Sequence, residues 1–412
     1  MRVCLIGATH PCHNPRLVRE ADTLVECGHE VRAVAVRTSL PLVDDDARLI
    51  ATRKWRLQTA SILRSPWPNL VRAIPGRLRR ELATRSFPRT GSTPDAENAL
   101  CEAAPELLRL AVSEPADWFI AHTQPVLGVA ARAARKWNAR LGFDCEDLLA
   151  LTGHNDPALI HSIEAAYLPA CDYVSATSPA MATRLHQQYG IPVPTVLYNV
   201  FPLDMARHMK PPEQRPAAAL LRLHWSGQTM GPGKGLEEAV EAAGRAGGGV
   251  EIFLRGTPVS GYGEKLSRMA RERNLSLAFL PHLHHDELLG AMDQFDVGLA
   301  LERASDPNYS ITVTNKFFSY MLAGLALAAT DTPGQREVFE QAPAAGFMYP
   351  SGRPELLAEQ LRRWCDDRNG LRAAQSAAWR VARERFCWDV EKTKFLTLLE
   401  RPVARPAQVP AG

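Results

Sequence analysis

The stretch ITVTNKFFSYMLAGLALAATDTPGQREV, residues 311–338, decides the fold. Thr314 stands at the N-cap position of a predicted helix that begins at Asn315. Gly324 is the type of residue that ends a helix, and the apolar run 325–329 after it predicts a short strand. A helix followed at once by a buried strand is typical of an α/β sheet with parallel strands.

A second helix is predicted directly after that strand, at Thr332-Pro333-Gly334-Gln335. Threonine is an N-cap residue, proline suits the first helical position, and glutamine can close a capping box. Both helix N-termini would lie at the carboxyl edge of the sheet, where exposed amides attract anions. Lys316, in the first turn of the first helix, would add a positive charge. The stretch predicts an anion site, with a solvent-facing lysine on an ordinary surface helix as the open alternative.

Length and composition indicate two globular domains. The 412 residues are 46% hydrophobic, enough for two domains of roughly 200 residues with separate cores. A net charge of +3 is too small to indicate a nucleic-acid partner. The eight cysteines contain no C-x-x-C pair and are expected to be reduced. No run approaches the ~18 apolar residues of a membrane span, and the apolar N-terminus is too short for a signal peptide, so we expect a cytoplasmic protein.

The first forty residues predict a βαβ unit. A strand over 2–6 is followed by a loop with two histidines, a helix from Asn14 to about Cys27, and a strand over 31–36. The first turn lacks G-x-G-x-x-G, so dinucleotide binding has no support. Further strands of this domain are predicted over 118–121, 141–143, 173–176 and 195–198.

Polar residues follow two of these strands. His122 comes directly after 118–121, and the acidic turn Asp144–Asp147 comes after 141–143. Because the carboxyl ends of parallel strands meet at one edge, we expect these groups to lie close together. A lone histidine is otherwise often structural, and that alternative stays open.

The segment from Lys54 to Arg89 is strongly basic and carries aromatic residues, including Trp55 and Trp67. Against the single acid Glu81 it holds the cations Lys54, Arg56, Arg64, Arg72, Arg77, Arg79, Arg80, Arg85 and Arg89. Such an amphipathic segment suits an anionic membrane surface or an acidic acceptor. The alternatives are a lid over an acceptor cleft and a helical insertion that packs on its own domain.

The second half repeats the α/β pattern after a proline-rich linker. Strands are predicted over 220–225, 250–254, 277–280, 297–301 and 325–329, with helices over 237–245 and 286–295. A helix pair over 373–399 and a disordered tail complete the chain. The predicted organisation is a first domain over 1–203 with a basic insertion at about 50–90, a linker over 204–216, a second domain over 217–375, a terminal helix over 376–400 and a tail over 401–412.

A glycine-rich loop opens the second domain. Residues 226–235, SGQTMGPGKG, follow the first strand and place Lys234 beside a helix start, where glycines let amides approach an anion. It is not a Walker A loop, because Gly235 stands where Ser or Thr would hold magnesium. Arg255 follows the next strand, and with Lys316 these three cations suit a diphosphate. An ordinary glycine-rich turn is the alternative.

His282, His284 and His285 form a histidine cluster without an obvious third-ligand motif, so a polar loop is expected and no metal site.

The residues resemble a known group of enzymes. Two Rossmann-like halves with a terminal helix are similar to the GT-B fold, an α/β architecture in which two domains face each other across a cleft and the last helix crosses back to the first domain. The similarity is strongest over 227–238, 296–302 and 314–338, which resemble retaining glycosyltransferases of family 4. It implies transfer of a sugar from a nucleoside-diphosphate sugar, with retention of anomeric configuration and without a cofactor.

The resemblance also implies residue roles. Lys234 would neutralise the β-phosphate, the amides of 314–316 would hold phosphate oxygens, and His122 would contact the donor sugar. The catalytic candidates are His122, Lys234 and Glu302; the nucleotide-sugar candidates are Ser226, Gly227, Lys234, Arg255, Thr312, Thr314, Asn315 and Lys316; the acceptor-side candidates are His10, Asn14, Asp144 and Glu146.

The sequence departs from the family pattern in two places. The family often has two glutamates near this helix; here Ile311 and Ser319 stand in their places, and Glu302 is a substitute carboxylate. An arginine of the glycine loop is replaced by Gln228, and Arg255 would take over its charge.

The expected partners are a nucleoside-diphosphate sugar and a small-molecule, glycan or lipid-linked acceptor, with peripheral association at the inner face of a membrane and no nucleic acid. A nucleotide-sugar 2-epimerase, which shares the fold, remains an open alternative. A non-catalytic nucleotide-sugar-binding protein is a second alternative, because the glutamates are missing.

Overall fold

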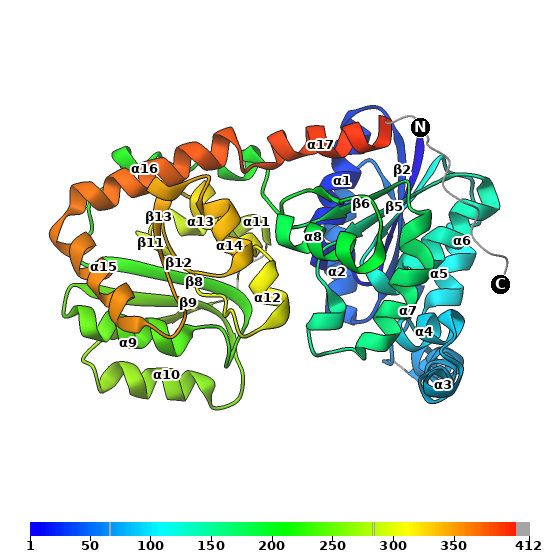
Figure 1. Cartoon of the computed structure of the whole chain (residues 1–412), viewed down its shortest axis with the longest axis horizontal. Helices are drawn as coiled ribbons and strands as arrows, with labels where there is room; N and C mark the ends of the chain where they lie inside the picture. The colour runs from blue at the N-terminus through cyan, green and yellow to red at the C-terminus, as the bar shows by residue number, and fades with distance from the viewer. Residues whose placement is uncertain (66, 282, 284, 401–412) are drawn as a thin grey trace. The chain divides into compact units, whose positions relative to one another are not determined.

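The computed structural model describes residues 1–65, 67–281, 283 and 285–400 (Figure 1). The chain divides into two compact units. Among the described residues, unit 1 consists of Met1–Leu197 together with residues 392–400, and unit 2 of Tyr198–Glu391. The end of the chain therefore returns to the first unit, as expected for the terminal helix. Within unit 1, Lys392 lies 3.8 Å from Glu26, and Arg140 donates a hydrogen bond of 3.4 Å to the Leu399 carbonyl.

Unit 1 is built on a parallel sheet of seven strands in the order β3-β2-β1-β4-β5-β6-β7. The strands are β1 Arg2–Gly7, β2 Glu30–Arg37, β3 Arg56–Ser61, β4 Trp118–His122, β5 Arg140–Cys145, β6 Tyr173–Ala176 and β7 Thr195–Val196. The central strands are apolar throughout because helices cover both faces of a parallel sheet. Helices α1 and α2 lie on one face and α5 and α6 on the other (Figure 1).

The helices of unit 1 begin and end where the sequence supplies caps. Asn14 accepts from the Leu17 amide and starts α1, and Gly28, at φ 79°, follows its end. The helices are α1 Pro15–Glu26, α2 Leu40–Ala51, α3 Trp67–Thr90, α4 Thr93–Leu100, α5 Ala104–Ala111, α6 Leu127–Trp137, α7 Pro157–Tyr167 and α8 Pro179–Tyr189, with α17 Trp388–Glu400 returning to the unit.

Unit 2 is built on a second parallel sheet, of six strands in the order β10-β9-β8-β11-β12-β13. The strands are β8 Leu221–Met230, β9 Val250–Pro258, β10 Ser276–Leu280, β11 Val297–Ala300, β12 Ala326–Thr330 and β13 Gly346–Tyr349. The helices are α9 Leu236–Ala246, α10 Tyr262–Arg271, α11 His285–Leu288, α12 Pro307–Ile311, α13 Asn315–Leu322, α14 Pro333–Phe339, α15 Pro354–Asp366 and α16 Arg368–Glu384.

Two predictions about elements were wrong. The predicted helix over 286–295 is only the short α11 followed by a 3-10 turn at Gly290–Met292. Strand β8 continues to Met230, with an irregularity between Ser226 and Thr229, so the first half of the expected glycine loop is strand. Of the basic segment, for which no strand was predicted, residues 56–61 form the edge strand β3 and Trp67–Thr90 the helix α3.

The predicted histidine cluster and tail lie largely beyond what the structure covers: His282, His284 and the tail 401–412 are outside the described residues. Among the helices that the structure describes, none combines the length and apolar character needed to cross a bilayer.

Candidate active site

In unit 2, a buried carboxylate gathers two of the predicted anion-binding residues. Glu302 follows β11, is almost fully buried, and accepts a bond of 3.0 Å from the Thr314 hydroxyl on Oε1. Lys316 Nζ lies 2.9 Å from the same oxygen. Thr314 occupies the N-cap position of α13, but its side chain does not cap the helix, so the predicted side-chain cap was wrong. The hydroxyl is directed to Glu302 instead.

Lys234 joins this cluster from the turn before α9. Its ammonium lies 2.5 Å from the Tyr309 hydroxyl and 4.2 Å from the centroid of that ring. Burial opposes ionisation of Glu302, but Lys316, Lys234 and the Thr314 hydroxyl together hold its pKa below the ordinary value. The carboxylate is therefore ionised at neutral pH and brings the two predicted lysines to one place.

Two glycines make the close backbone approaches of this region possible. Gly235 has φ 68°, and a Cβ there would lie 2.6 Å from Cβ of Leu301. At Gly334, in the first turn of α14, a Cβ would lie 2.6 Å from the Thr312 carbonyl oxygen. Side chains at either position would force apart the segments that bear Lys234 and the α14 N-terminus.

Two of the other nucleotide-sugar candidates, Ser226 and Gly227, lie in strand β8, and Thr312 follows α12. The Ser226 amide donates to the Tyr320 hydroxyl at 3.0 Å, and a Cβ on Gly227 would meet the Trp225 ring at 2.5 Å. Thr312 is buried, and its hydroxyl donates to the Asn308 carbonyl at 3.1 Å within α12.

Arg255 pairs with Ser226 in the β8–β9 register, but its guanidinium donates to the Pro281 carbonyl. Burial lowers its pKa, and within the described residues its Nε has no hydrogen-bond partner. Of the three predicted cations, Lys316 pairs with Glu302 and Lys234 contacts the neighbouring Tyr309, whereas Arg255 is engaged with Pro281.

The start of α14 also differs from the prediction in one detail. Thr332 caps the helix by accepting from the Gln335 amide at 3.3 Å, as predicted. The Gln335 side chain does not close the capping box; its amide group donates to the Thr330 carbonyl at 2.8 Å. That bond fixes the end of β12 against the helix that follows it.

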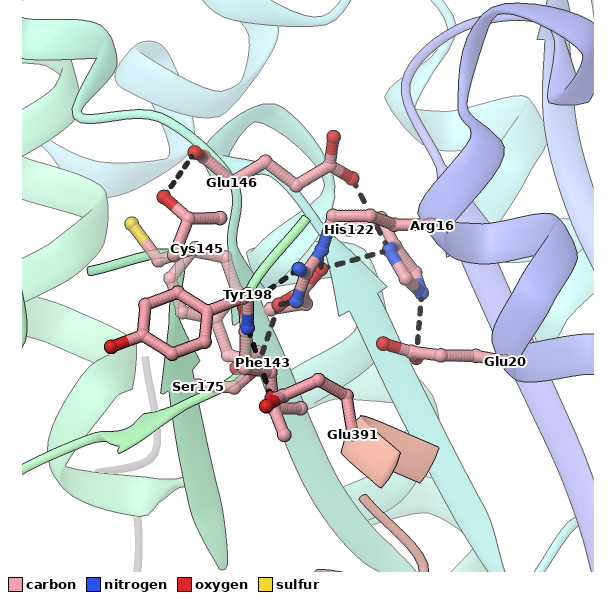
Figure 2. A network of polar contacts seen from close by, with 12 residues as sticks. Arg16, Glu20, His122, Phe143, Cys145, Glu146, Ser175, Tyr198 and Glu391 are labelled. Atoms are coloured by element: carbon pink, nitrogen blue, oxygen red, sulfur yellow. Dashed lines mark hydrogen bonds and ion pairs between the residues drawn. The ribbon is translucent and has the colours of Figure 1, made fainter. Parts of the chain in front are cut away.

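In unit 1, His122 lies at the end of β4 within a buried ionic cluster (Figure 2). Its Nε2 is 3.2 Å from Glu20 Oε2, and its Nδ1 is 3.4 Å from Asp144 Oδ2 and 3.3 Å from Glu146 Oε1. Register places His122 directly opposite Asp144 on the neighbouring strand, so the predicted meeting of these groups is confirmed.

Arg16 completes the cluster from α1. It binds Asp144 through two bonds, of 2.6 Å from Nε and 2.5 Å from Nη2, and the Ser175 hydroxyl donates to the same carboxylate at 2.6 Å. Burial alone would raise the pKa of Asp144, but Arg16 and His122 hold it far below the ordinary value. Asp144 is therefore a permanent anion.

The electrostatics of the cluster fix the protonation state of the histidine. Burial disfavours the imidazolium, yet the attraction of Glu20 and the bonds to Asp144 and Glu146 raise the pKa of His122 well above its ordinary value. Burial raises the pKa of Glu20, and the attraction of His122 offsets only part of that rise. A histidine held charged at neutral pH cannot act as a general base there, but it can stabilise negative charge.

The acceptor-side candidates are divided between this cluster and a second one. Asn14 donates to Glu146 at 2.7 Å and so joins the His122 cluster. His10 is buried, with Nδ1 2.6 Å from Asp46 and Nε2 accepting from the Thr38 amide at 2.8 Å. Both nitrogens of His10 are therefore occupied by groups of unit 1, namely Asp46 of α2 and the Thr38 amide that follows β2.

Two groups of side chains have the spacing of a metal site: His10 with Cys12 and Asp46, and Glu20 with His122 and Asp144. In the first, Nε2 of His10 faces a backbone donor, which places the ring proton on Nδ1, toward Asp46. In the second, His122 is charged. Metal binding at either group would require release of the proton from the histidine nitrogen concerned.

Sequence reasoning missed Arg16, as a partner of Asp144, and Glu20. Both are charged residues on one face of α1, four positions apart, and both are buried. The available signal was this pair of charges beside the apolar residues Leu17 and Leu24 on that face.

Comparisons with known proteins agree with this architecture. Residues 13–202 match the model of a glycosyl transferase 4-like domain. A search of curated proteins finds no match to the chain. Similar solved structures include HepE of Anabaena in complex with UDP, at 16% identity and a TM-score of 0.68 over 97% of this chain and 100% of that one.

Two further structures are similar over nearly their whole length. Sucrose-phosphate synthase of Thermosynechococcus elongatus is 14% identical, with a TM-score of 0.69 over 97% of this chain and 98% of that one. TarM of S. aureus, in complex with fondaparinux, alpha-GlcNAc-glycerol and UDP, is 9% identical, with a TM-score of 0.65 over 97% and 100%. With its two Rossmann-like units the chain has the GT-B fold of these structures, and its residues 13–202 match a glycosyl transferase 4-like domain.

Proposed function

We propose that the protein transfers a sugar from a nucleoside-diphosphate sugar to an acceptor, with retention of anomeric configuration. The observation that carries the proposal is the convergence of Lys234 and Lys316 on Glu302 beside the N-terminus of α13. Two cations and a helix N-terminus favour binding of a diphosphate. HepE and TarM bind UDP in their solved structures, which supports uridine as the base of the donor.

In this proposal the cations act on the leaving group. As the bond from sugar to diphosphate breaks, negative charge grows on the diphosphate, and preorganised lysines and amides lower the barrier. The donor's own phosphate accepts the proton of the acceptor hydroxyl. Because the protein supplies the positive charge itself, we propose that the reaction needs no divalent metal and no cofactor.

Glu302 has a positioning role in the proposal. It holds Lys316 and Thr314 on one oxygen, and Ser319, which stands where the family has a glutamate, instead donates to the Lys316 carbonyl at 2.9 Å. A buried carboxylate that fixes the lysine keeps the cation in place before the donor arrives. In unit 1 we propose that the charged His122 stabilises the transition state electrostatically and that Asn14, Asp144 and Glu146 shape the acceptor side.

The acceptor classes are a small molecule, a glycan and a lipid-linked saccharide. TarM is solved with the glycan fondaparinux and with alpha-GlcNAc-glycerol, which supports a saccharide acceptor.

The test uses the full chain and radiolabelled UDP-sugars, with and without a panel of saccharides. The proposal predicts release of UDP and labelled product in which the anomeric configuration of the donor is kept, determined by NMR. Inverted product would refute retention. An isomerised sugar without transfer would indicate the 2-epimerase, and UDP-sugar binding without any turnover would indicate the non-catalytic binder.

A further inference from the structure

Helix α3, Trp67–Thr90, has two apolar faces. The face formed by Ala73, Ala83 and Phe87 is buried, and the helix packs on α4 (Figure 1). The opposite face bears large apolar side chains that are exposed to solvent: Trp67 at 73%, Leu70 at 36%, Val71 at 47%, Ile74 at 54%, Leu78 at 54% and Leu82 at 55%. Their spacing of three and four residues makes a continuous stripe along one side of the helix.

We call this set the α3 stripe. In the part of the chain that the structure describes, it contains six of the twelve large apolar side chains that are exposed. From Trp67 to Leu82 it extends over about 22 Å at the helical rise of ~1.5 Å per residue. Single exposed apolar residues are ordinary on a protein surface, but a contiguous stripe of this kind marks a binding surface.

An arginine-rich hollow flanks the stripe. It has a volume of about 350 Å³ and is lined by Arg64, Arg77, Arg80, Glu81, Thr84 and Arg85. The lining carries four positive charges and one negative charge. Glu81 lies 3.3 Å from Arg85, whereas within the described residues Arg77 forms no ion pair, so the hollow keeps an excess of positive charge beside the apolar surface.

We propose that α3 docks unit 1 on an anionic lipid bilayer, with the α3 stripe at the boundary of headgroups and acyl chains and the arginine hollow around lipid phosphates. Charge complementarity selects this partner, because an apolar stripe flanked by arginines fits a surface that is apolar inside and anionic outside. A second copy of the chain would place arginines opposite arginines, and that repulsion disfavours self-association. The proposal goes beyond sugar transfer and does not rest on it.

Only part of the basic segment identified in the sequence, residues 54–89, can contact a membrane. Trp55 is buried, and its Nε1 donates to Asp22 at 2.7 Å, so this tryptophan is not available to a membrane surface. Arg56 belongs to the edge strand β3 and lies 2.8 Å from Glu114. Only α3 and the adjoining Arg64 form the docking surface.

The test is flotation of the full chain with vesicles of pure phosphatidylcholine and with vesicles containing phosphatidylglycerol. The variants are Ile74→Ser with Leu78→Ser, which removes the centre of the stripe, and Arg77→Glu with Arg85→Glu, which reverses the charge of the hollow. All four side chains are exposed, so folding should be preserved, and this is checked by the melting temperature.

Matched controls come from exposed positions elsewhere in unit 1. Val193→Ser removes an apolar side chain that is 62% exposed, and Arg48→Glu reverses a charge that is 69% exposed. At low salt the wild type and both controls should bind the anionic vesicles at least about tenfold better than the neutral ones. The charge variant should lose that preference, and the stripe variant should bind neither kind of vesicle.

Three results would overturn the proposal. The first is a wild type that stays in the soluble fraction with anionic vesicles at low salt. The second is vesicle binding by the two α3 variants that equals that of the controls. The third is a wild type that does not bind vesicles and that light scattering shows to be a dimer, while the stripe variant is a monomer. The stripe would then be an interface between copies.

Discussion

Replacement of His122 by alanine should destabilise unit 1 in a manner that depends on pH. The ring is fully buried and is the cation that faces Glu20, which is itself 1% exposed. Asp144 keeps its two bonds from Arg16 in the variant, so Glu20 is the carboxylate that loses its nearest cation. Removal of one partner from a buried ion pair costs roughly 3–5 kcal/mol.

The carboxyl of Glu20 can limit this cost by taking up a proton. From its ordinary pKa of 4.5, protonation at pH 7 costs about 3.4 kcal/mol, and at pH 5.5 about 1.4 kcal/mol, at 1.36 kcal/mol per pH unit. We therefore expect His122→Ala to lower the free energy of unfolding by about 3 kcal/mol at pH 7 and by distinctly less at pH 5.5. The double variant with Glu20→Gln removes the charge itself and should recover most of the loss at pH 7.

The assay is urea denaturation of the full chain at both pH values, with hydrogen exchange of β4 amides to identify the unit 1 transition. A loss below about 1 kcal/mol at pH 7, or a loss that is the same at both pH values, would refute the buried ion pair. Failure of Glu20→Gln to rescue the variant would show that Glu20 is not the residue left unpaired.

Three further predictions concern the charged groups of both units. Lys234→Ala should weaken UDP binding by roughly 1.5–3 kcal/mol by calorimetry, whereas Lys265→Ala, whose ammonium pairs with Glu237 on the surface, should leave it unchanged; equal affinities would remove Lys234 from the site. Transfer activity should survive a strong chelator, and loss of activity that a divalent ion restores would contradict a metal-independent reaction. Because the pKa of His122 is higher in the folded than in the unfolded protein, its protonation stabilises the fold; this contribution is complete below pH 6.5 and is lost as pH rises through the folded pKa. The free energy of unfolding in urea should therefore fall on the alkaline side. A histidine resonance that titrates near 6.5 would show that the ring is uncharged at neutral pH.

The sheets were predictable because their strands are buried on both faces. Such strands appear in the sequence as short apolar runs, and β1, β4 and β11 were found in this way. The same rule fails where a strand is exposed. The extension of β8 includes Gln228 and Thr229, both exposed, and the edge strand β3 is mostly polar, so neither carries the apolar signal although both are hydrogen-bonded to a neighbour.

The orientation of α3 could not be read from its sequence. Apolar residues occur on two opposite faces, and the periodicity alone does not say which face the domain covers. The buried face uses small residues such as Ala73 and Ala83, which allow close packing on α4, and leaves Ile74 and Leu78 outside.

The polar contacts of the site were predictable only where they follow from strand register. Adjacent strand ends bring His122 and Asp144 together, because neighbouring parallel strands end at the same edge. Glu20 and Arg16 reach the same place from a helix, and their approach depends on how α1 packs on the sheet. No local spacing in the sequence encodes that distance.

The departure at Thr314 is the most informative of these differences. Local rules direct the hydroxyl of an N-cap threonine to an amide of the first helical turn, yet Thr314 donates it to Glu302. The first-turn amides of α13 thereby receive no bond from that side chain, while Lys316 is held beside them by the same carboxylate. A helix that gives up a side-chain cap worth about 1 kcal/mol retains amide donors for an anion. This local rule is broken where the proposed diphosphate site needs those donors, as expected for a functional rather than a structural helix start.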